Sequence, residues 1–122
     1  MEPEIRRFDR PDEVRTFDRG SFEVLHIGGM TIGRAVYDPG WRWSEHVAPT
    51  AGTPTCQVEH LGMVVSGHAA IGMDDGHEVI VGPGDVFAMP AGHDSWVVGE
   101  EPYESLHFLG AEDYADAGSD GA

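Results

Sequence analysis

The chain has 122 residues, enough for one domain with a core but too short for two, and its 17 glycines and 8 prolines are typical of short strands joined by turns. Its formal net charge is −15, all 7 basic residues are arginines, and none follows Arg42, so nucleic acid and anionic membrane surfaces are poor partners. The absence of lysine excludes Schiff-base chemistry, and the single cysteine excludes an intrachain disulfide.

The first residues lack the apolar segment of a signal peptide, and no apolar run in the sequence reaches the length of a membrane span. A lone cysteine also fits a reducing compartment. We therefore expect a soluble, cytoplasmic protein.

The first half of the chain predicts an arm followed by a hairpin and a further strand. Residues 1–20 mix acids with arginines and predict a charged N-terminal arm or edge strand. Period-two patterning around Gly28 and Gly29 predicts a hairpin. After a turn at residues 38–40, residues 41–47 are a plausible strand, and residues 48–55, which contain two prolines and a glycine, predict a loop.

The second half predicts further strands and no helix. The clearest hairpin pairs residues 69–73 with 77–81 around an Asp-Asp-Gly turn. The other predicted strands cover residues 56–66, 86–89, 95–98 and 103–109. Residues 111–122 contain four acids and no base, which predicts an acidic flexible tail after a barrel domain at residues 21–110.

Many short strands with frequent turns predict an all-β sandwich or barrel. The segment GPGDVFAMPAGH, residues 82–93, then sharpens this prediction, because Gly84, Pro90 and Gly92 have the spacing of the second signature of the cupin superfamily. The resemblance covers residues 37–108. It implies a cupin double-stranded β-helix, a jelly-roll-like barrel, in which this segment directs a histidine toward a metal ion.

The first cupin signature is matched only in part. Gly40 and His46 match its opening and Gly67 matches its end, but the expected second histidine is absent and His60 stands where the family has glutamate. In the second signature, the usual ligand position holds Ser95. The resemblance therefore implies the barrel more firmly than the usual set of metal ligands.

The candidate metal ligands are His46, Cys56 and His60, completed by His93 or His107. Cys56 and His60 share one strand face by period two, as does Val58 between them. Imidazole and thiolate ligands suit zinc best, with iron, nickel or copper as alternatives. A lone cysteine in a barrel is also often a small buried apolar residue, His93 could simply hydrogen-bond within its turn, and His107 could be a core histidine.

Other residues are candidates for the pocket and for proton transfer. Within a barrel that holds one small ligand, pocket residues would be Arg42, Trp43, Trp96 and His107, with Trp41 and Phe108 as further aromatic candidates. Core packing for the aromatic residues, and a surface ion pair for Arg42, are the alternative interpretations. Glu45 and Tyr103 are candidate catalytic acids or bases, alongside Glu59 and Asp94.

Three functional hypotheses follow from these residues and from the resemblance. The first is a metal-dependent cupin enzyme acting on a small organic substrate, as a Lewis-acid lyase, isomerase or cyclase or as a dioxygenase. The second is a non-catalytic module that binds or senses a small ligand. A storage role, as in seed-storage members of the family, is the third hypothesis. The resemblance also implies a homodimer paired through N-terminal strands.

Overall fold

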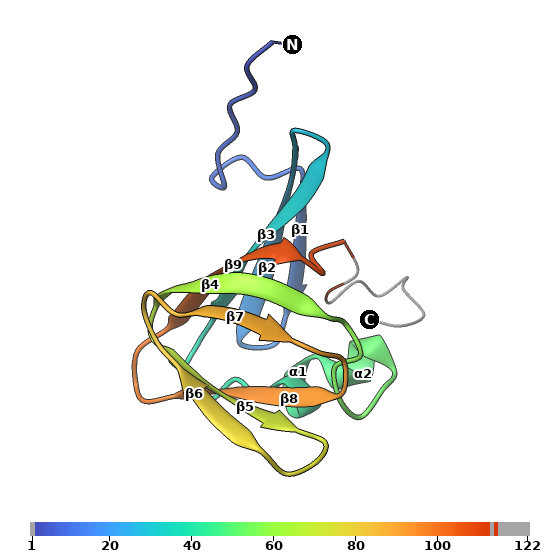
Figure 1. Ribbon diagram of the computed structural model, residues 1–122, viewed down its shortest axis with the longest axis vertical. Coiled ribbons are helices and arrows are strands. Elements are labelled where there is room, and N and C mark those ends of the chain that lie inside the picture. Colours follow the sequence, from blue (N-terminus) through green and yellow to red (C-terminus); the bar gives the residue numbers. More distant parts are fainter. Residues whose placement is uncertain (1, 113, 115–122) are drawn as a thin grey trace.

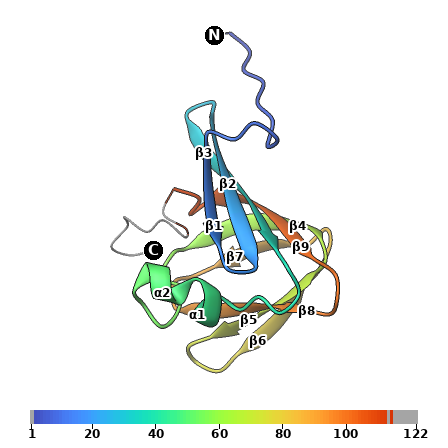
Figure 2. The ribbon, with the colours of Figure 1, turned by 180° about the vertical axis from the view of Figure 1, so that it is seen from behind.

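The computed structural model, described here for residues 2–112 and 114, consists of two antiparallel sheets. One has the strand order β1-β2-β3-β9-β4-β7 and the other β6-β5-β8, and they lie across the core from each other (Figures 1 and 2). The strands are β1 (Glu13–Phe17), β2 (Gly20–Ile27), β3 (Met30–Tyr37), β4 (His60–Ser66), β5 (His68–Met73), β6 (Glu78–Val81), β7 (Val86–Met89), β8 (His93–Val98) and β9 (Tyr103–Leu109).

The two predicted hairpins are confirmed. Strands β2 and β3 pair in full register around Gly28 and Gly29, whose φ angles of 59° and 77° only glycine adopts at no steric cost. Strands β5 and β6 form the second hairpin. Residues 13–17, in the predicted arm or edge strand, form edge strand β1 against β2.

Residues 41–51 differ from the prediction, because they form two short helices, α1 (Trp43–His46) and α2 (Ala48–Ala51), in place of a strand and a loop. Proline stands in the first turn of α2, where its missing N–H costs nothing, and Gly52 ends α2 in the left-handed conformation. The aromatic spacing at Trp41 and Trp43 indicated a strand, yet both side chains are 1% exposed because both pack into the core.

Strand β4 is also shorter than predicted, since it begins at His60. The preceding residues still alternate, with Cys56 and Val58 buried and Gln57 and Glu59 exposed. Cys56 makes an isolated bridge to His93 in place of a continuous ladder.

The core lies between the two sheets and is apolar except at one place. Phe22, Val24, Val64 and Trp41 are among its fully buried side chains. The buried polar side chains of the described residues are His60, His93, Ser105 and His107. Burying so many histidines in one core is costly unless their nitrogens are paired or bind a ligand, so this is where a functional site is expected.

The end of the described chain departs from the predicted tail. Ala111 and Tyr114 are buried, at 1% and 3% exposure, whereas residues 113 and 115–122 lie outside the described part. No helix of the described residues has the length and apolar character needed to cross a membrane.

Candidate metal centre

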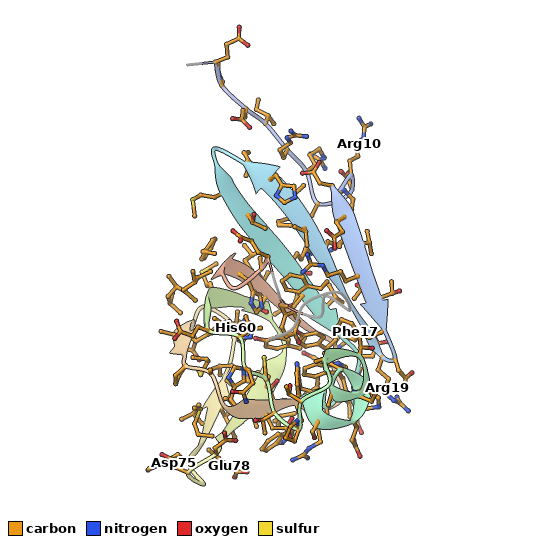
Figure 3. The ribbon with its side chains drawn as sticks, turned by 90° about the vertical axis from the view of Figure 1, so that its right-hand side faces the viewer. Arg10, Phe17, Arg19, His60, Asp75 and Glu78 are labelled. Carbon is orange, nitrogen blue, oxygen red and sulfur yellow. The ribbon has the colours of Figure 1, made fainter. Side chains whose placement is uncertain are left out.

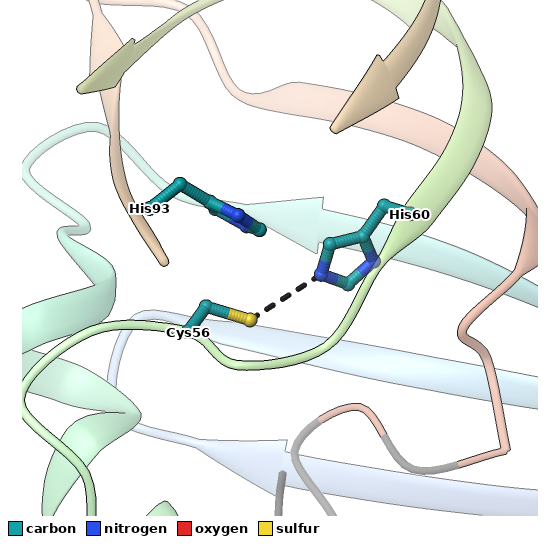
Figure 4. Close-up of side chains that lie close together, drawn as sticks. All are labelled: Cys56, His60 and His93. Carbon is teal, nitrogen blue, oxygen red and sulfur yellow. Dashed lines mark hydrogen bonds between the residues drawn. The ribbon is translucent and has the colours of Figure 1, made fainter. Parts of the chain in front are cut away.

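Three buried side chains, Cys56, His60 and His93, converge inside the barrel. One donor atom from each lies within 4.8 Å of the other two, and Cys56 Sγ lies 3.3 Å from His60 Nε2 (Figure 4). Figure 3 places His60 between the sheets, far from Asp75 and Glu78 at the exposed end of the β5–β6 hairpin. The cluster is therefore an interior feature and not a surface group of acids.

Backbone pairing places Cys56 beside His93. The Cys56 N–H donates to the His93 carbonyl at 2.7 Å, and the Cys56 carbonyl accepts from His93 at 3.3 Å and from Gly92 at 2.8 Å. Opposed residues of an antiparallel pair project their side chains to the same face. Gly92 has a φ of 89°, which turns the chain into β8 immediately before His93.

The ring of His93 is oriented by a second hydrogen bond. Its Nδ1 lies 2.8 Å from the Pro90 carbonyl, which can only accept, so Nδ1 carries the proton. Nε2 of His93 is then the nitrogen with the free lone pair. Histidines that bind metals usually donate their other ring N–H to a carbonyl or carboxylate in this way.

His60 is oriented by a chain of polar groups that ends on β9. His60 Nδ1 lies 3.3 Å from His107 Nδ1, and His107 Nε2 lies 3.0 Å from Ser105 Oγ. Since His60 Nε2 faces Cys56, a consistent arrangement has His60 Nδ1–H donate to His107 and His107 Nε2–H donate to Ser105. This leaves His60 Nε2, like His93 Nε2, able to act as a donor to a metal.

Burial keeps all of these groups neutral in the metal-free protein. Burial raises the pKa of the Cys56 thiol to about 12 and lowers the pKa of His107 to about 3. Burial also lowers the pKa of His93, and, together with the neighbouring imidazoles, that of His60 to well below its usual value. The thiol is therefore protonated at neutral pH and can share a hydrogen bond with His60 Nε2.

The donor set fits a metal ion such as zinc. Zinc lies about 2.3 Å from sulfur and about 2.0–2.1 Å from imidazole nitrogen, so tetrahedral donors are roughly 3.3–3.8 Å apart. The Sγ–Nε2 distance of 3.3 Å between Cys56 and His60 is within about 0.3 Å of the roughly 3.6 Å expected for a sulfur–nitrogen pair. The cluster offers three buried donors, each neutral or monoanionic, and it could therefore hold a metal ion.

A small cavity of about 40 Å³ adjoins the two histidines of the cluster. Its walls are mostly aromatic, and Tyr37 stacks on Trp41 with ring centroids 3.7 Å apart and on Tyr103 at 5.6 Å. The residues that line it are Tyr37, Trp41, His60, Ala69, Ile71, Phe87, Met89, His93, Ser95, Tyr103, Ser105, His107 and Tyr114.

No protein-family model and no curated protein sequence matches the chain. Solved structures do match. A protein of unknown function from Rhizobium leguminosarum bv. viciae 3841 is 22% identical, with a TM-score of 0.63 over 88% of this chain and 95% of that one. Oxalate decarboxylase from Lactobacillus farciminis is 19% identical, with a TM-score of 0.58 over 80% of this chain and 30% of that one. Procruciferin, an 11S globulin from Brassica napus, is 15% identical, with a TM-score of 0.59 over 90% and 31%.

The chain has the cupin fold. It spans less than a third of the decarboxylase and of the globulin, and nearly all of the Rhizobium protein. The relatives include both an enzyme and proteins of unknown function, so the likeness establishes the architecture alone.

Within the cupin barrel, the structure brings together three of the four ligands in the predicted set. Cys56, His60 and His93 converge, whereas His46 lies on α1 outside the cluster. His46 Nδ1 accepts the Arg42 backbone N–H at 2.9 Å, and its Nε2 lies 3.5 Å from Asp18 Oδ2. The helical turns at residues 43–51 replace the strand that would have directed His46 inward.

The predicted pocket residues are only partly at the cavity. His107 lines it, but Trp43 packs in the core and Arg42 and Trp96 stand apart from the lining. Arg42 Nε donates to Asp94 Oδ2 at 3.1 Å, and its guanidinium lies 4.3 Å from the Trp96 ring centroid. Trp96 follows Ser95, which lines the cavity, so its side chain points to the opposite face of β8, and residue 42 pairs with it through an isolated backbone bridge.

The two predicted catalytic residues also separate. Tyr103 is 5% exposed and lines the cavity, and burial raises its pKa to about 12. Glu45 is exposed on α1 and does not reach the cavity. The cavity lining includes no acidic residue from the described part of the chain, so Glu59 and Asp94 are absent from it as well.

Several cavity residues have no counterpart among the predicted site residues, and Tyr37, Ser105 and Tyr114 are the ones that take part in hydrogen bonds inside the barrel. Ser105 could have been found from period two along β9, since Tyr103, Ser105 and His107 are all buried. Tyr114 carries a weaker signal, as an aromatic residue isolated among acids in a segment that otherwise resembles a solvated tail.

Proposed function

We propose that this cupin is a metal-dependent enzyme in which Cys56, His60 and His93 hold a divalent ion and a small organic substrate binds beside it. The observation that carries the proposal is the convergence of three buried donors within 4.8 Å, two of them imidazoles whose far nitrogens are already hydrogen-bonded. Sulfur and nitrogen donors favour zinc over a hard, oxygen-seeking ion, with iron, nickel and copper as alternatives.

Three protein donors are the number found in catalytic zinc sites, which keep a further position for water or substrate. A bound ion would supply Lewis acidity, polarising a substrate oxygen or lowering the pKa of a bound water. The chain's own residues supply orientation. The backbone bridge fixes Cys56 against His93, and the hydrogen bond with His107, which is itself paired with Ser105, orients the ring of His60.

Tyr103 is the proposed proton donor of the site. Its buried side chain lines the cavity, and a pKa of about 12 keeps it in the phenol form at neutral pH. A phenol in this state donates a hydrogen bond to a substrate oxygen and holds a proton for it. The surrounding apolar and aromatic walls exclude bulk water and strengthen such an interaction.

Metal analysis tests the proposal. Native protein purified without added metal should contain close to one equivalent of a transition metal, and Cys56→Ser and His60→Gln should lose it. His68→Gln is the matched control, because His68 is an exposed histidine outside the cluster. Cobalt substitution should give a thiolate-to-cobalt charge-transfer band that disappears in Cys56→Ser, and wild-type protein that binds no metal would refute the proposal.

A second candidate is a module that binds a small ligand without catalysis. The observation in its favour is the absence of Asp and Glu from the described cavity lining, which leaves no carboxylate to act as general base. It predicts a ligand that stabilises metal-free protein, with no loss of that stabilisation in His60→Gln.

A further inference from the structure

The Tyr114 side chain occupies the barrel interior next to the proposed metal ligands. Its ring centroid lies 5.0 Å from that of His60 in an edge-on contact and 5.9 Å from that of His107 in a nearly parallel one. Phe22 closes the other side, with ring centroids 4.8 Å apart. The Tyr114 hydroxyl makes a hydrogen bond of 2.5 Å with the Tyr37 hydroxyl. The side chain thus has the surroundings of a bound phenol.

Tyr114 follows the last strand and belongs to neither sheet. Its backbone N–H donates to the Gly110 carbonyl at 3.1 Å. The guanidinium of Arg15, on edge strand β1, donates to the carbonyls of Ala111, Glu112 and Tyr114 at 2.9, 2.8 and 2.7 Å. These hydrogen bonds and the buried side chains of Ala111 and Tyr114, and not a strand ladder, hold this segment against the barrel.

The other walls of the cavity are fixed to the sheets. All but Tyr114 and Trp41 lie on strands β3, β4, β5, β7, β8 and β9, and Trp41 accepts the backbone N–H of Val97 on β8 at 3.1 Å. The cavity of about 40 Å³ has room for a water molecule but not for an organic substrate. Any ligand of that size beside His60 must therefore displace a wall, and Tyr114 is the lining side chain that can leave without breaking a sheet.

We propose that the site binds a planar aromatic ligand bearing a hydroxyl group, a phenol, which takes the place of the Tyr114 side chain as that side chain swings out. The inference rests on the proposed function for the ligand's place beside the metal, but binding itself needs only the slot. The ring would lie against His107 and Phe22, and its hydroxyl would pair with Tyr37. The indole N–H of buried Trp41 has no acceptor among the described residues, so it is a further donor in the wall available to a ligand oxygen.

The equilibrium between closed and open Tyr114 sets the apparent affinity. A ligand that binds only the open state has a dissociation constant raised by the reciprocal of the open fraction. Removing the Arg15 hydrogen bonds weakens the closed state and increases that fraction. Arg15→Gln should therefore bind a phenol more tightly than wild type, by roughly tenfold or more.

The probe is p-cresol, which is the side chain of tyrosine itself, and toluene is the matched probe without the hydroxyl. Binding is measured by calorimetry on the full chain for wild type, Arg15→Gln and Arg34→Gln. Arg34 is the control because it is also paired with carboxylates on the same sheet, Glu23 and Glu104, and these ion pairs join strands and do not involve the C-terminal segment. We expect p-cresol to bind Arg15→Gln most tightly, with Arg34→Gln like wild type.

Two further variants test the inference if Arg15→Gln folds poorly. Tyr114→Ala leaves the slot open, so p-cresol should raise its melting temperature more than toluene does. Adding Tyr37→Phe to Tyr114→Ala should abolish the preference for p-cresol over toluene. If p-cresol binds Tyr114→Ala but not wild type or Arg15→Gln, Tyr114 is a fixed core residue and the inference is wrong. Equal binding of the two probes would refute recognition of the hydroxyl.

Metal content, measured on the same samples, separates this inference from the proposed function. Wild-type protein that binds p-cresol but contains no metal would refute the metal site and leave the phenol slot. Protein that holds metal but binds no phenol in any variant would refute the slot and leave the metal site.

Discussion

Replacing Gly33 by alanine tests the packing behind the candidate site. Gly33 lies on β3 opposite His107 of β9. A methyl group built on it would lie 2.5 Å from Cε2 of the Phe22 ring and closer still to Cζ. The ring cannot move freely, because Phe22 is fully buried and its centroid lies 5.2 Å from that of His107 and 4.8 Å from that of Tyr114.

Inserting a methyl group into such a core costs about 1–3 kcal/mol, and this contact belongs at the upper end of that range. Exchanging glycine for alanine within a strand returns about 0.5–1 kcal/mol. The expected net loss in the free energy of unfolding is about 2 kcal/mol, which lowers the melting temperature by roughly 6–10 °C in a chain of this size. Chemical denaturation of the metal-free protein, with a thermal scan beside it, measures both quantities.

The Phe22→Leu change supplies the internal control. If the Phe22 ring causes the loss, Gly33→Ala in the Phe22→Leu background should cost at least about 1 kcal/mol less than in wild type. Additive effects, within about 0.5 kcal/mol, would refute the reasoning, as would a Gly33→Ala protein as stable as wild type.

Three other predictions concern the histidines and the thiol. Burial lowers the pKa of His107 from 6.5 to about 3, so between these pH values the unfolded chain binds one more proton at this residue than the folded chain does. The free energy of unfolding of metal-free protein therefore decreases as the pH is lowered below about 6.5, by up to about 1.4 kcal/mol per pH unit. Urea titrations at several pH values should show a shallower fall in His107→Phe, and equal slopes would contradict the assignment. His107→Gln should weaken zinc binding by about 10–100-fold through the lost support of His60, measured by competition with a chelator, whereas unchanged affinity would remove His107 from the site. The Cys56 thiol, fully buried with a pKa of about 12, should react with iodoacetamide far more slowly in folded metal-free protein than in denatured protein, and rapid labelling of the folded form would contradict this.

The sequence was sufficient to predict an all-β barrel, because turns and alternation are local properties, and the resemblance at residues 82–93 then specified the cupin fold. The hairpin at Gly28 and Gly29 and the buried alternation from Cys56 to His60 both follow from patterns a few residues long. The short helices at residues 43–51 were missed because buried tryptophans at positions 41 and 43 imitate the alternation of a strand.

The candidate site was predicted only in part, for a different reason. His93 joins Cys56 through a bridge between residues 37 positions apart, and only the family resemblance brought them into one set. His46 was included by the same resemblance, but the local helix takes its ring elsewhere. The segment that carries Tyr114 accepts three hydrogen bonds from Arg15, about 100 positions away, and no pattern within either segment reveals such a contact.

The position of Tyr114 beyond the last strand separates the size of the binding site from the pairing of the strands. A change to a strand residue that lines the cavity also disturbs a ladder of hydrogen bonds, whereas a change at Tyr114 leaves every strand pairing in place. Related chains could therefore acquire larger or smaller ligands by altering a few residues after β9. For the same reason, a chain shortened after Gly110 would keep its sheets and yet have a different binding site.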